Sequence, residues 1–346
     1  VQTCALPISN QKIYSRLDLQ SFFAENVKPN YLNLMNVYNS FDDDTVKERE
    51  FNTQKSIDTQ DVNQMLNLQG SPNFRVLEEL VEIVSSHIEN LSGIGLEIGS
   101  GSAALAAAFV NKYKNLTGVL ALEAGKPFVQ EAIPKLVMAC VNENDRKKIL
   151  PTLGDFNEIF IEDNSLDFVL QIESLHHSEN LEISVKEIFR LLKPGGILIS
   201  IDRSWESSTQ KNTLEEMLNH RYSDEWLKMK GFREGKIRTR RDNGEHEYRD
   251  SDWRNVFEKS GFYIDTFRVL VPPIKAKEVL KRMLCILGLQ NLIGIKVKPR
   301  NGVSRSFLLR LMRPNKIIQF NELIQTDRKS TRLNSSHANI SYAVFC

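Results

Sequence analysis

The sequence predicts an α/β fold in which a mostly parallel β-sheet is covered by helices. From Gly95 onward, short apolar runs with β-strand composition alternate with segments of helical composition, and this alternation is typical of parallel sheets with crossover helices. A glycine-rich turn, residues 99–101, directly follows the first run. Upstream, residues 10–90 have a mostly helical pattern. These three observations indicate one large α/β domain preceded by a helical extension.

The expected elements follow in order along the chain. Four apolar runs are predicted to be buried strands: Ile94–Ile98, Gly118–Leu122, Phe168–Ile172 and Ile197–Ile201. Three segments between them have helical composition: Ala103–Lys112, Pro134–Asn142 and Leu181–Leu192. Two more strands are expected nearer the C-terminus: Tyr263–Val271 and Phe307–Met312. Because Asn and Ser are good N-caps, helices are also predicted over Phe74–Ile88, after Asn73, and from Ser251 to about Lys259.

The chain divides into a helical N-terminal extension, residues 9–90, and a larger α/β domain, residues 91–326. Within this domain, residues 203–250 form an insertion on the expected substrate side, and residues 272–304 form a helical insertion before the last strand. With 346 residues and 41% hydrophobic content, the chain is long enough to bury a full core.

Residues 1–8 and 327–346 differ from the rest because they resemble translated sequencing-adapter sequence. Asp327-Arg328-Lys329-Ser330, written GAT CGG AAG AGC, has the reverse complement GCT CTT CCG ATC, which encodes Ala5-Leu6-Pro7-Ile8. We therefore interpret both ends as one adapter on opposite strands, and assign neither of them to the fold or the function.

The overall charge is close to zero, with 45 basic and 44 acidic residues, so composition gives no reason to expect nucleic-acid or membrane binding. No apolar run reaches the roughly 20 residues that a membrane-spanning helix needs. Outside the adapter-like ends, the cysteines are Cys140 and Cys285, too few for a disulfide framework or a cysteine-rich zinc site. We expect a cytoplasmic protein without a metal ion.

The glycine-rich turn is the first candidate for a ligand site. Residues 97–103 read Glu-Ile-Gly-Ser-Gly-Ser-Ala and lead from an apolar strand into an alanine-rich helix. Gly99 and Gly101 let the backbone bend sharply and approach a ligand with no Cβ in the way. A nucleotide-like cofactor would suit this turn, although such a turn also occurs without a ligand.

Further motifs follow at ordered spacings. Glu123 lies 24 residues after Gly99, at the end of the next apolar strand. Gly154-Asp155-Phe156 comes next, and then residues 164–169, Asn-Ser-Leu-Asp-Phe-Val. Residues 192–196, Leu-Lys-Pro-Gly-Gly, precede the strand at Ile197. Each motif alone is only a turn signal.

In this order, the motifs resemble those of the class I S-adenosylmethionine-dependent methyltransferases, particularly the branch that modifies small metabolites. The resemblance covers Gly93 to Val271. It implies a Rossmann-like sheet, mostly parallel with an antiparallel last strand, and S-adenosylmethionine as the cofactor bound by residues 91–326.

The resemblance assigns the cofactor site residue by residue. Glu97, Gly99 and Gly101 match the family's first motif, where backbone groups hold the methionine moiety, and Ser100 lies between them in the same site. The family often has a third glycine where this chain has Ala103, which is small enough for close packing of helix on strand.

The remaining cofactor residues come from the next three strands. Glu123 matches the acid that binds the ribose hydroxyls. Asp155 matches the acid that accepts the adenine amino group, with Phe156 beside it as a main-chain or ring contact. Gln171 ends the strand after which the family places residues near the methionine end and the substrate.

Three residues are candidates for proton transfer. Methyl transfer from a sulfonium needs mainly alignment, but an alcohol or phenol acceptor must also lose a proton. His176 and His177 follow the strand that ends at Ile172, and a histidine has an unperturbed pKa of about 6.5. Asp202 ends the following strand and is the third candidate. A histidine here also has a simpler interpretation, since it can merely hold the loop.

Substrate choice is expected to depend on residues 203–250. Residues 236–240 and 245–248 flank Asp242-Asn243-Gly244, which is a hairpin signal. The basic side chains of the first run favour an anionic substrate, whereas pairing with Glu245 and Glu247 across the turn favours a solvated hairpin. The apolar stripe at 275–287 predicts a helix packed on its own domain, or one that contacts a membrane surface or a partner.

The sequence therefore predicts transfer of a methyl group to oxygen or nitrogen of a small metabolite, sugar or lipid-linked intermediate. A non-catalytic cofactor-binding or scaffold protein is one alternative. A nicotinamide-dependent oxidoreductase is another, but it predicts Gly-x-Gly-x-x-Gly, and Ala104 stands at the third glycine position. Nucleic acid is not expected as a substrate, because the chain lacks an Asn/Asp-Pro-Pro-Tyr/Phe run and a Pro-Cys nucleophile.

Overall fold

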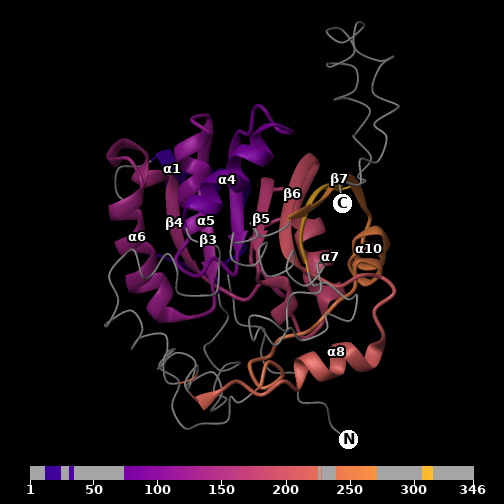
Figure 1. Ribbon diagram of the computed structural model, residues 1–346. Helices are drawn as coiled ribbons and strands as arrows, with labels where there is room; N and C mark the ends of the chain where they lie inside the picture. The colour runs from indigo at the N-terminus through magenta and orange to yellow at the C-terminus, as the bar shows by residue number, and fades with distance from the viewer. Residues whose placement is uncertain are drawn as a thin grey trace, which may run out of the picture.

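The computed structural model describes residues 12–24, 31–34, 74–224, 227, 239–270 and 306–314. They form an eight-stranded sheet in the order β1-β4-β3-β2-β5-β6-β8-β7. The six strands from β1 to β6 run parallel: β1 (Leu32–Asn33), β4 (Ile149–Leu153), β3 (Leu116–Glu123), β2 (Gly93–Ile98), β5 (Leu166–Ile172) and β6 (Leu192–Ser204). The predicted parallel sheet covered by helices is confirmed (Figure 1).

The last two strands complete the sheet beside β6. β8 (Ser306–Pro314) lies between β6 and β7 (Phe262–Leu270) and pairs antiparallel with both. Both strands coincide with the two apolar runs expected near the C-terminus. The pairing brings a segment far along the chain next to β6, the strand that leads into the substrate-side insertion.

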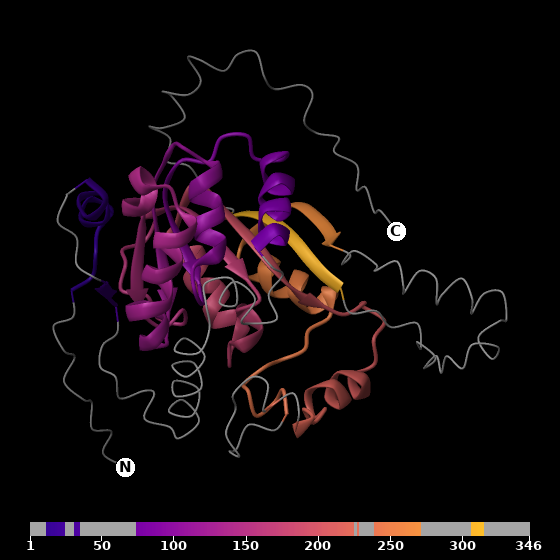
Figure 2. The same cartoon turned by 60° about the vertical axis from the view of Figure 1, so that its left-hand side comes forward.

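Two helical layers cover the sheet, one on each face (Figures 1 and 2). The first layer contains α4 (Phe74–Ser85), α5 (Ala104–Lys112) and α6 (Ile133–Cys140), which pack on a cluster that includes Val119, Phe168 and Ile199. The second contains α1 (Arg16–Ala24), α7 (Leu181–Leu191) and α10 (Asp250–Lys259), packed around Leu96, Val169 and Leu198. Because both faces are buried, the parallel strands read as almost continuous apolar runs.

Two strands were not predicted. β4 contains Pro151, which has no N–H for the ladder and argues against a strand in the middle of a sheet. The structure accommodates it near the edge, where Pro151 lies opposite Ala121 of β3 and the outer neighbour β1 has only two residues. β1 itself belongs to the N-terminal extension, so that extension contributes a strand as well as helices.

The N-terminal extension is attached to the sheet by specific contacts. Phe23 of α1 packs over Gly118, where an added Cβ would come within 2.2 Å of the ring. Arg16 donates from Nη2 to the Asp167 carboxylate at 2.7 Å and from Nη1 to the Ser165 carbonyl at 2.7 Å. The same Asp167 accepts the Ile94 N–H at 2.8 Å. α1 is therefore joined to the amino ends of β2 and β5, opposite the carboxyl ends where the glycine turn lies.

Some predicted helix boundaries need correction. α10 begins at Asp250, with Arg249 rather than Ser251 as its N-cap, because the Asp252 carboxylate accepts the Arg249 N–H at 2.9 Å. α4 ends at Ser85, before the expected Ile88, while its proposed cap Asn73 lies outside the described residues.

The insertion 203–250 contributes α8 (Lys211–Leu218). This helix lies apart from the sheet and belongs to neither helical layer (Figures 1 and 2). The insertion 272–304, the stripe at 275–287 and the adapter-like ends lie outside the described residues. None of the described helices is long and apolar enough to cross a membrane.

Candidate active site

The glycine turn between β2 and α5 has the backbone that its sequence predicts. Gly99 and Gly101 have φ angles of 58° and 52°, in the left-handed region that favours glycine. A Cβ on Gly99 would lie 2.4 Å from Cβ of Ser174, so a larger residue would collide with the loop after β5. Ala103, in the place of the family's third glycine, also has a positive φ of 61° and is fully buried.

Glu97 lies under this turn. Its side chain is fully buried, and Oε2 accepts the Ala106 N–H at 2.9 Å, at the start of α5. Burial raises the pKa of the Glu97 carboxyl to about 8, against the lowering effect of that hydrogen bond. The carboxyl group is therefore poised to be neutral or ionised near pH 8, depending on what lies beside it.

Glu123 ends β3 on the other side of the turn. Its Oε2 accepts the Gly101 N–H at 2.8 Å, and its Oε1 accepts the Ala124 N–H at 3.0 Å. Burial raises the pKa of Glu123, although these main-chain hydrogen bonds oppose the shift. The predicted ribose-binding acid thus lies directly beside the predicted methionine-binding turn.

The predicted adenine contacts lie one strand further along. Gly154, after β4, donates its N–H to the Glu123 carbonyl at 3.1 Å, which places Asp155 and Phe156 beside the end of β3. Oδ1 of Asp155 accepts two hydrogen bonds from Asn157, both at 2.8 Å. The ends of β2, β3 and β4 therefore gather the predicted cofactor residues at one edge of the sheet, the usual ligand edge of an open α/β fold.

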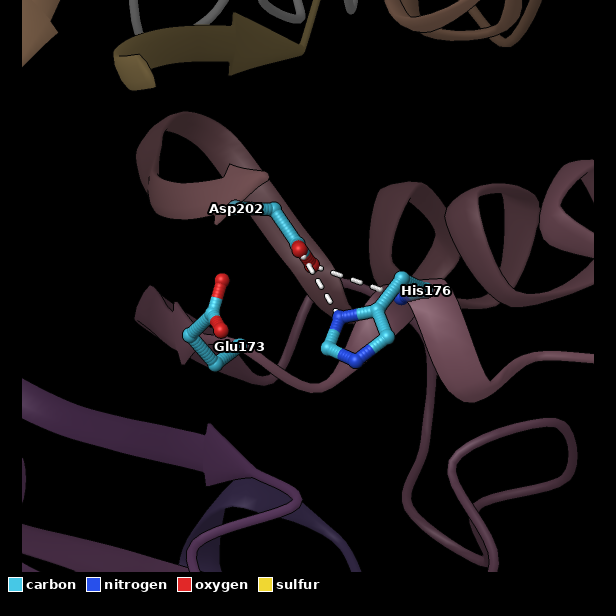
Figure 3. A group of neighbouring side chains, drawn as sticks. All are labelled: Glu173, His176 and Asp202. Atoms are coloured by element: carbon cyan, nitrogen blue, oxygen red, sulfur yellow. Dashed lines mark hydrogen bonds and ion pairs between the residues drawn. The ribbon is translucent and has the colours of Figure 1, made fainter. Parts of the chain in front are cut away.

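The structure brings His176 and Asp202 together. His176 lies in the short helix η4 (Leu175–His177) after β5, and its Nδ1 is 2.8 Å from Oδ1 of Asp202 at the end of β6 (Figure 3). The His176 N–H also donates to Asp202 Oδ2 at 3.3 Å. Both side chains are buried. His177 is adjacent, with its ring centroid 4.3 Å from that of His176.

Two further donors hold Asp202. Nε2 of Gln171 donates to Oδ2 at 2.8 Å, and the Arg203 N–H donates to Oδ1 at 2.7 Å. Burial acts to raise the pKa of the Asp202 carboxyl, but the charge and hydrogen bond of His176, with help from Arg203, keep that pKa below its ordinary value. Asp202 is therefore held ionised beside the imidazole.

Gln171 has a more specific position than its sequence context indicates. Besides its bond to Asp202, its Oε1 accepts the Ser200 hydroxyl at 2.5 Å, and the residue is fully buried. Both ends of its amide are thus engaged between β5 and β6. Gln171 therefore holds the Asp202 carboxylate in place. The expected contact between Gln171 and the methionine end of the cofactor stays a prediction.

Glu173 was not among the candidate site residues, yet it belongs to this cluster. Ligand atoms of Glu173, His176 and Asp202 lie within 4.8 Å of one another, a spacing that a metal ion could bridge. Each Asp202 oxygen, however, already accepts two hydrogen bonds, and the Arg203 guanidinium lies 3.6 Å from Glu173. We therefore interpret the trio as an ion-pair and hydrogen-bond network. Only its left-handed backbone, φ 51°, singles Glu173 out, and sequence does not show that.

The insertion forms a buried ionic cluster instead of the solvated hairpin expected. Arg240 donates to Glu245 Oε2 from Nε at 2.9 Å and Nη2 at 2.7 Å, and its Nη1 lies 2.9 Å from Glu247 Oε1. All three side chains are buried. The turn 239–244 is present, but residues 245–248 form no strand, because their acids point inward to the arginine. Lys236 and Arg238 lie outside the described residues.

The comparisons with known proteins agree with this site. Residues 96–200 match the family described as "Methyltransferase domain". The chain is 46% identical over 57 residues to sterol 24-C-methyltransferase of Schizosaccharomyces pombe, covering 16% of this chain and 15% of that protein. It is 52% identical over 44 residues to the Aspergillus fumigatus enzyme of the same name, covering 13% and 12%. The matched segments thus span less than a sixth of either relative.

Among solved structures, the chain resembles an S-adenosylmethionine-dependent methyltransferase from Clostridium acetobutylicum, with 11% identity, a TM-score of 0.46, and coverage of 72% of this chain and 95% of the other. The family match includes the glycine turn, Glu123, Asp155 and His176. Residues 96–200 are therefore similar to a methyltransferase domain, and this segment carries most of the candidate cofactor residues.

Proposed function

We propose that the chain methylates an oxygen or nitrogen atom of a small metabolite, sugar or lipid-linked intermediate, with His176 as the general base. One observation carries the proposal: the buried His176 Nδ1 lies 2.8 Å from the ionised Asp202 carboxylate. Histidine is the side chain that general acid–base catalysis uses most often, and a neighbouring carboxylate orients its ring.

The dyad defines the role of each atom. Asp202 accepts a hydrogen bond from the Nδ1–H of His176. This favours the tautomer in which Nε2 carries no proton and can accept one. When Nε2 takes the proton from an acceptor hydroxyl or ammonium group, the ionised Asp202 stabilises the imidazolium that results. Gln171 and the Arg203 N–H hold the carboxylate in this orientation.

The donor is proposed to lie over the glycine turn. S-Adenosylmethionine supplies a methyl group on a positively charged sulfur when bound. Main-chain groups of the turn at Gly99 would hold its methionine part, Glu123 its ribose and Asp155 its adenine, while the Gly101 N–H holds the Glu123 carboxylate in place. One observation supports the fit: the Ser100 hydroxyl is buried without a hydrogen-bond partner among the described residues.

Adjacent strands place the two halves of the site next to each other. β2 pairs with β5, with Ile98 opposite Gln171, so the glycine turn and the loop that carries His176 leave the sheet side by side. Ser174 of that loop donates its hydroxyl to the Ile98 carbonyl at 2.9 Å. The residues that would hold the donor and the proposed base are therefore carried by neighbouring loops, and alignment of reacting groups can contribute about 7–11 kcal/mol.

Calorimetry with S-adenosylmethionine tests the donor site. We expect the full-length wild type to bind, and Glu123→Ala and Asp155→Ala to bind at least ten times more weakly. Glu82→Ala is the matched control, because Glu82 is exposed and pairs with Lys112 on the surface. Unchanged affinity in both site variants would remove these residues from the cofactor site.

Product analysis tests the acceptor. The chain is incubated with methyl-labelled S-adenosylmethionine and a cell extract, and the labelled product is identified by mass spectrometry. We expect the label on oxygen or nitrogen. The curated relatives are named as methyltransferases of carbon 24 of a sterol, so a label on carbon would overturn the oxygen or nitrogen assignment. A His176→Ala variant with full turnover, against His87→Ala as control, would remove the base.

A further inference from the structure

Arg203 connects two parts of the active site that are distant in sequence. It directly follows Asp202 at the end of β6, and its side chain is buried. Nη2 donates to Glu245 Oε2 of the insertion at 2.7 Å. On its other side, Nε lies 3.6 Å from Glu173 Oε2 in the loop after β5. One guanidinium thus faces both the insertion and the loop that carries His176.

The loop end of this connection is strained. Glu173 has a φ of 51°, an unfavourable conformation for a residue with a Cβ. Its N–H donates to the Ile201 carbonyl at 2.9 Å, two residues before Arg203. A strained backbone persists only when its surroundings hold it, and from β6 the Ile201 carbonyl and the nearby Arg203 guanidinium both contact Glu173. Glu173 lies three residues before His176, so any relaxation there would reach the proposed base.

The insertion end of the connection also contacts His176 directly. His246 donates its N–H to the His176 carbonyl at 2.8 Å. Its neighbour Glu245 is anchored by Arg240 and accepts the Tyr222 hydroxyl at 2.9 Å. The position of residues 245–246 and the position of the His176 loop are therefore coupled twice, once through a main-chain bond and once through Arg203.

We propose that Arg203 is a positioning residue, which locks the Glu173–His176 loop to the insertion so that His176 is correctly placed only while the insertion is docked. The consequence for catalysis rests on the proposed role of His176, but the structural coupling does not. Arginine suits this position because its planar, multidentate group addresses two carboxylates at once, which a lysine ammonium does less well.

Hydrogen–deuterium exchange on the full-length chain tests the coupling. In Arg203→Gln we expect faster exchange both in peptides that cover 173–177 and in those that cover 245–249, and in Arg203→Lys a smaller increase in both. Arg241→Gln is the control, since Arg241 belongs to the same insertion but forms an exposed pair with Glu215. Faster exchange in only one of the two segments would overturn the coupling.

A second variant covers the case in which Arg203→Gln does not fold. Glu173→Gly removes both the strain and the ion pair at the loop end, and we expect it to raise exchange at 245–249 although it lies outside the insertion. No change there would contradict the proposal. Once an acceptor is known, Arg203→Lys should lower kcat about 10-fold or more while leaving the affinity for S-adenosylmethionine within two-fold.

The outcomes separate this proposal from the proposed function. If exchange is coupled but His176→Ala keeps full turnover, Arg203 positions the loop and the base assignment fails. If His176→Ala abolishes turnover while the two segments exchange independently, the base assignment stands and Arg203 is not a positioning residue.

Discussion

The two halves of the candidate active site bury their carboxylates in opposite ways. On the cofactor side, Glu97 and Glu123 accept hydrogen bonds from main-chain N–H groups, and burial raises both pKa values. On the acceptor side, Asp202 and Glu245 are also buried. Asp202 faces His176, Glu245 faces Arg203 and Arg240, and the pKa values of both acids are lowered. Burial alone thus does not decide the charge state of an acid here. The partner does.

This difference suits the two tasks. Carboxyl groups held by main-chain amides keep a fixed geometry and have no cationic side chain beside them among the described residues, so a bound ligand can become their partner. The acceptor-side acids already have cationic or hydrogen-bonding partners within the protein, which favour their ionised form. Three experiments test this contrast and a fourth tests the backbone of the glycine turn, in order of decreasing effect.

The largest effect is expected from Asp202→Asn. The amide cannot act as the anionic partner of the His176 Nδ1–H, so both the tautomer and the imidazolium lose their support, and the methyl-transfer rate should fall by roughly 10²–10⁴-fold. The rate is measured with labelled S-adenosylmethionine and the identified acceptor. Asp163→Asn is the control, an exposed acid paired with Arg190. A loss of less than three-fold would contradict the dyad.

Next is Arg240→Met in the insertion. Removing one partner from a buried ion pair leaves Glu245 and Glu247 undercompensated, and the free energy of unfolding should fall by about 3–5 kcal/mol. Arg241→Met removes an exposed pair and should cost at most about 1 kcal/mol. Urea unfolding of both variants makes the comparison. Equal costs would show that burial of this pair has no energetic weight.

On the cofactor side, Glu97→Gln should raise the free energy of unfolding, whereas Arg240→Met should lower it. The folded chain holds the Glu97 proton up to about pH 8, above its ordinary pKa of 4.5, so wild-type stability declines as pH rises between these values. The neutral amide avoids that cost. Without cofactor, Glu97→Gln should be nearly neutral at pH 5 and stabilising by roughly 1–3 kcal/mol at pH 8. A pH-independent difference in urea unfolding would refute the raised pKa.

The smallest effect is expected from Ala103→Gly. Relief of the left-handed backbone, roughly 1–2 kcal/mol, is offset by about 0.8 kcal/mol for the lost buried methyl group and by the greater chain entropy of glycine. The net change should stay within about 0.5 kcal/mol. Gly99→Ala is the contrast, since its Cβ collides with Ser174 and should cost about 1–3 kcal/mol. Thermal unfolding of both variants would decide.

Sequence patterns predicted the sheet well where a strand is long, apolar and free of proline. They missed β4, where Pro151 disguises a strand, and β1, which has two residues. The gathering of the candidate cofactor residues was predictable because they lie at the ends of successive parallel strands, and topology alone brings those ends together. The His176–Asp202 pair follows from the same rule, although its hydrogen bond does not.

The acceptor side was less predictable for physical reasons. Charged residues usually lie at the surface, so Arg240, Glu245 and Glu247 were assigned to a solvated hairpin. Their pairing across the turn was expected, but their burial also depends on Arg203, 42 positions before Glu245, and no local pattern encodes that contact. A non-glycine left-handed residue such as Glu173 is equally invisible, because the strain arises from the packing around it.

The contact between Arg16 and Asp167 has a consequence for how the chain folds during synthesis. The two residues are separated by 151 positions. At about 5–20 residues per second, α1 would leave the ribosome roughly 8–30 s before its partner strand β5 exists. During that interval its buried face, which includes Leu19 and Phe23, has no β5 against which to settle. The Arg16–Asp167 contact can therefore form only after strands β2, β3 and β4, which precede β5 in the chain, have been synthesised.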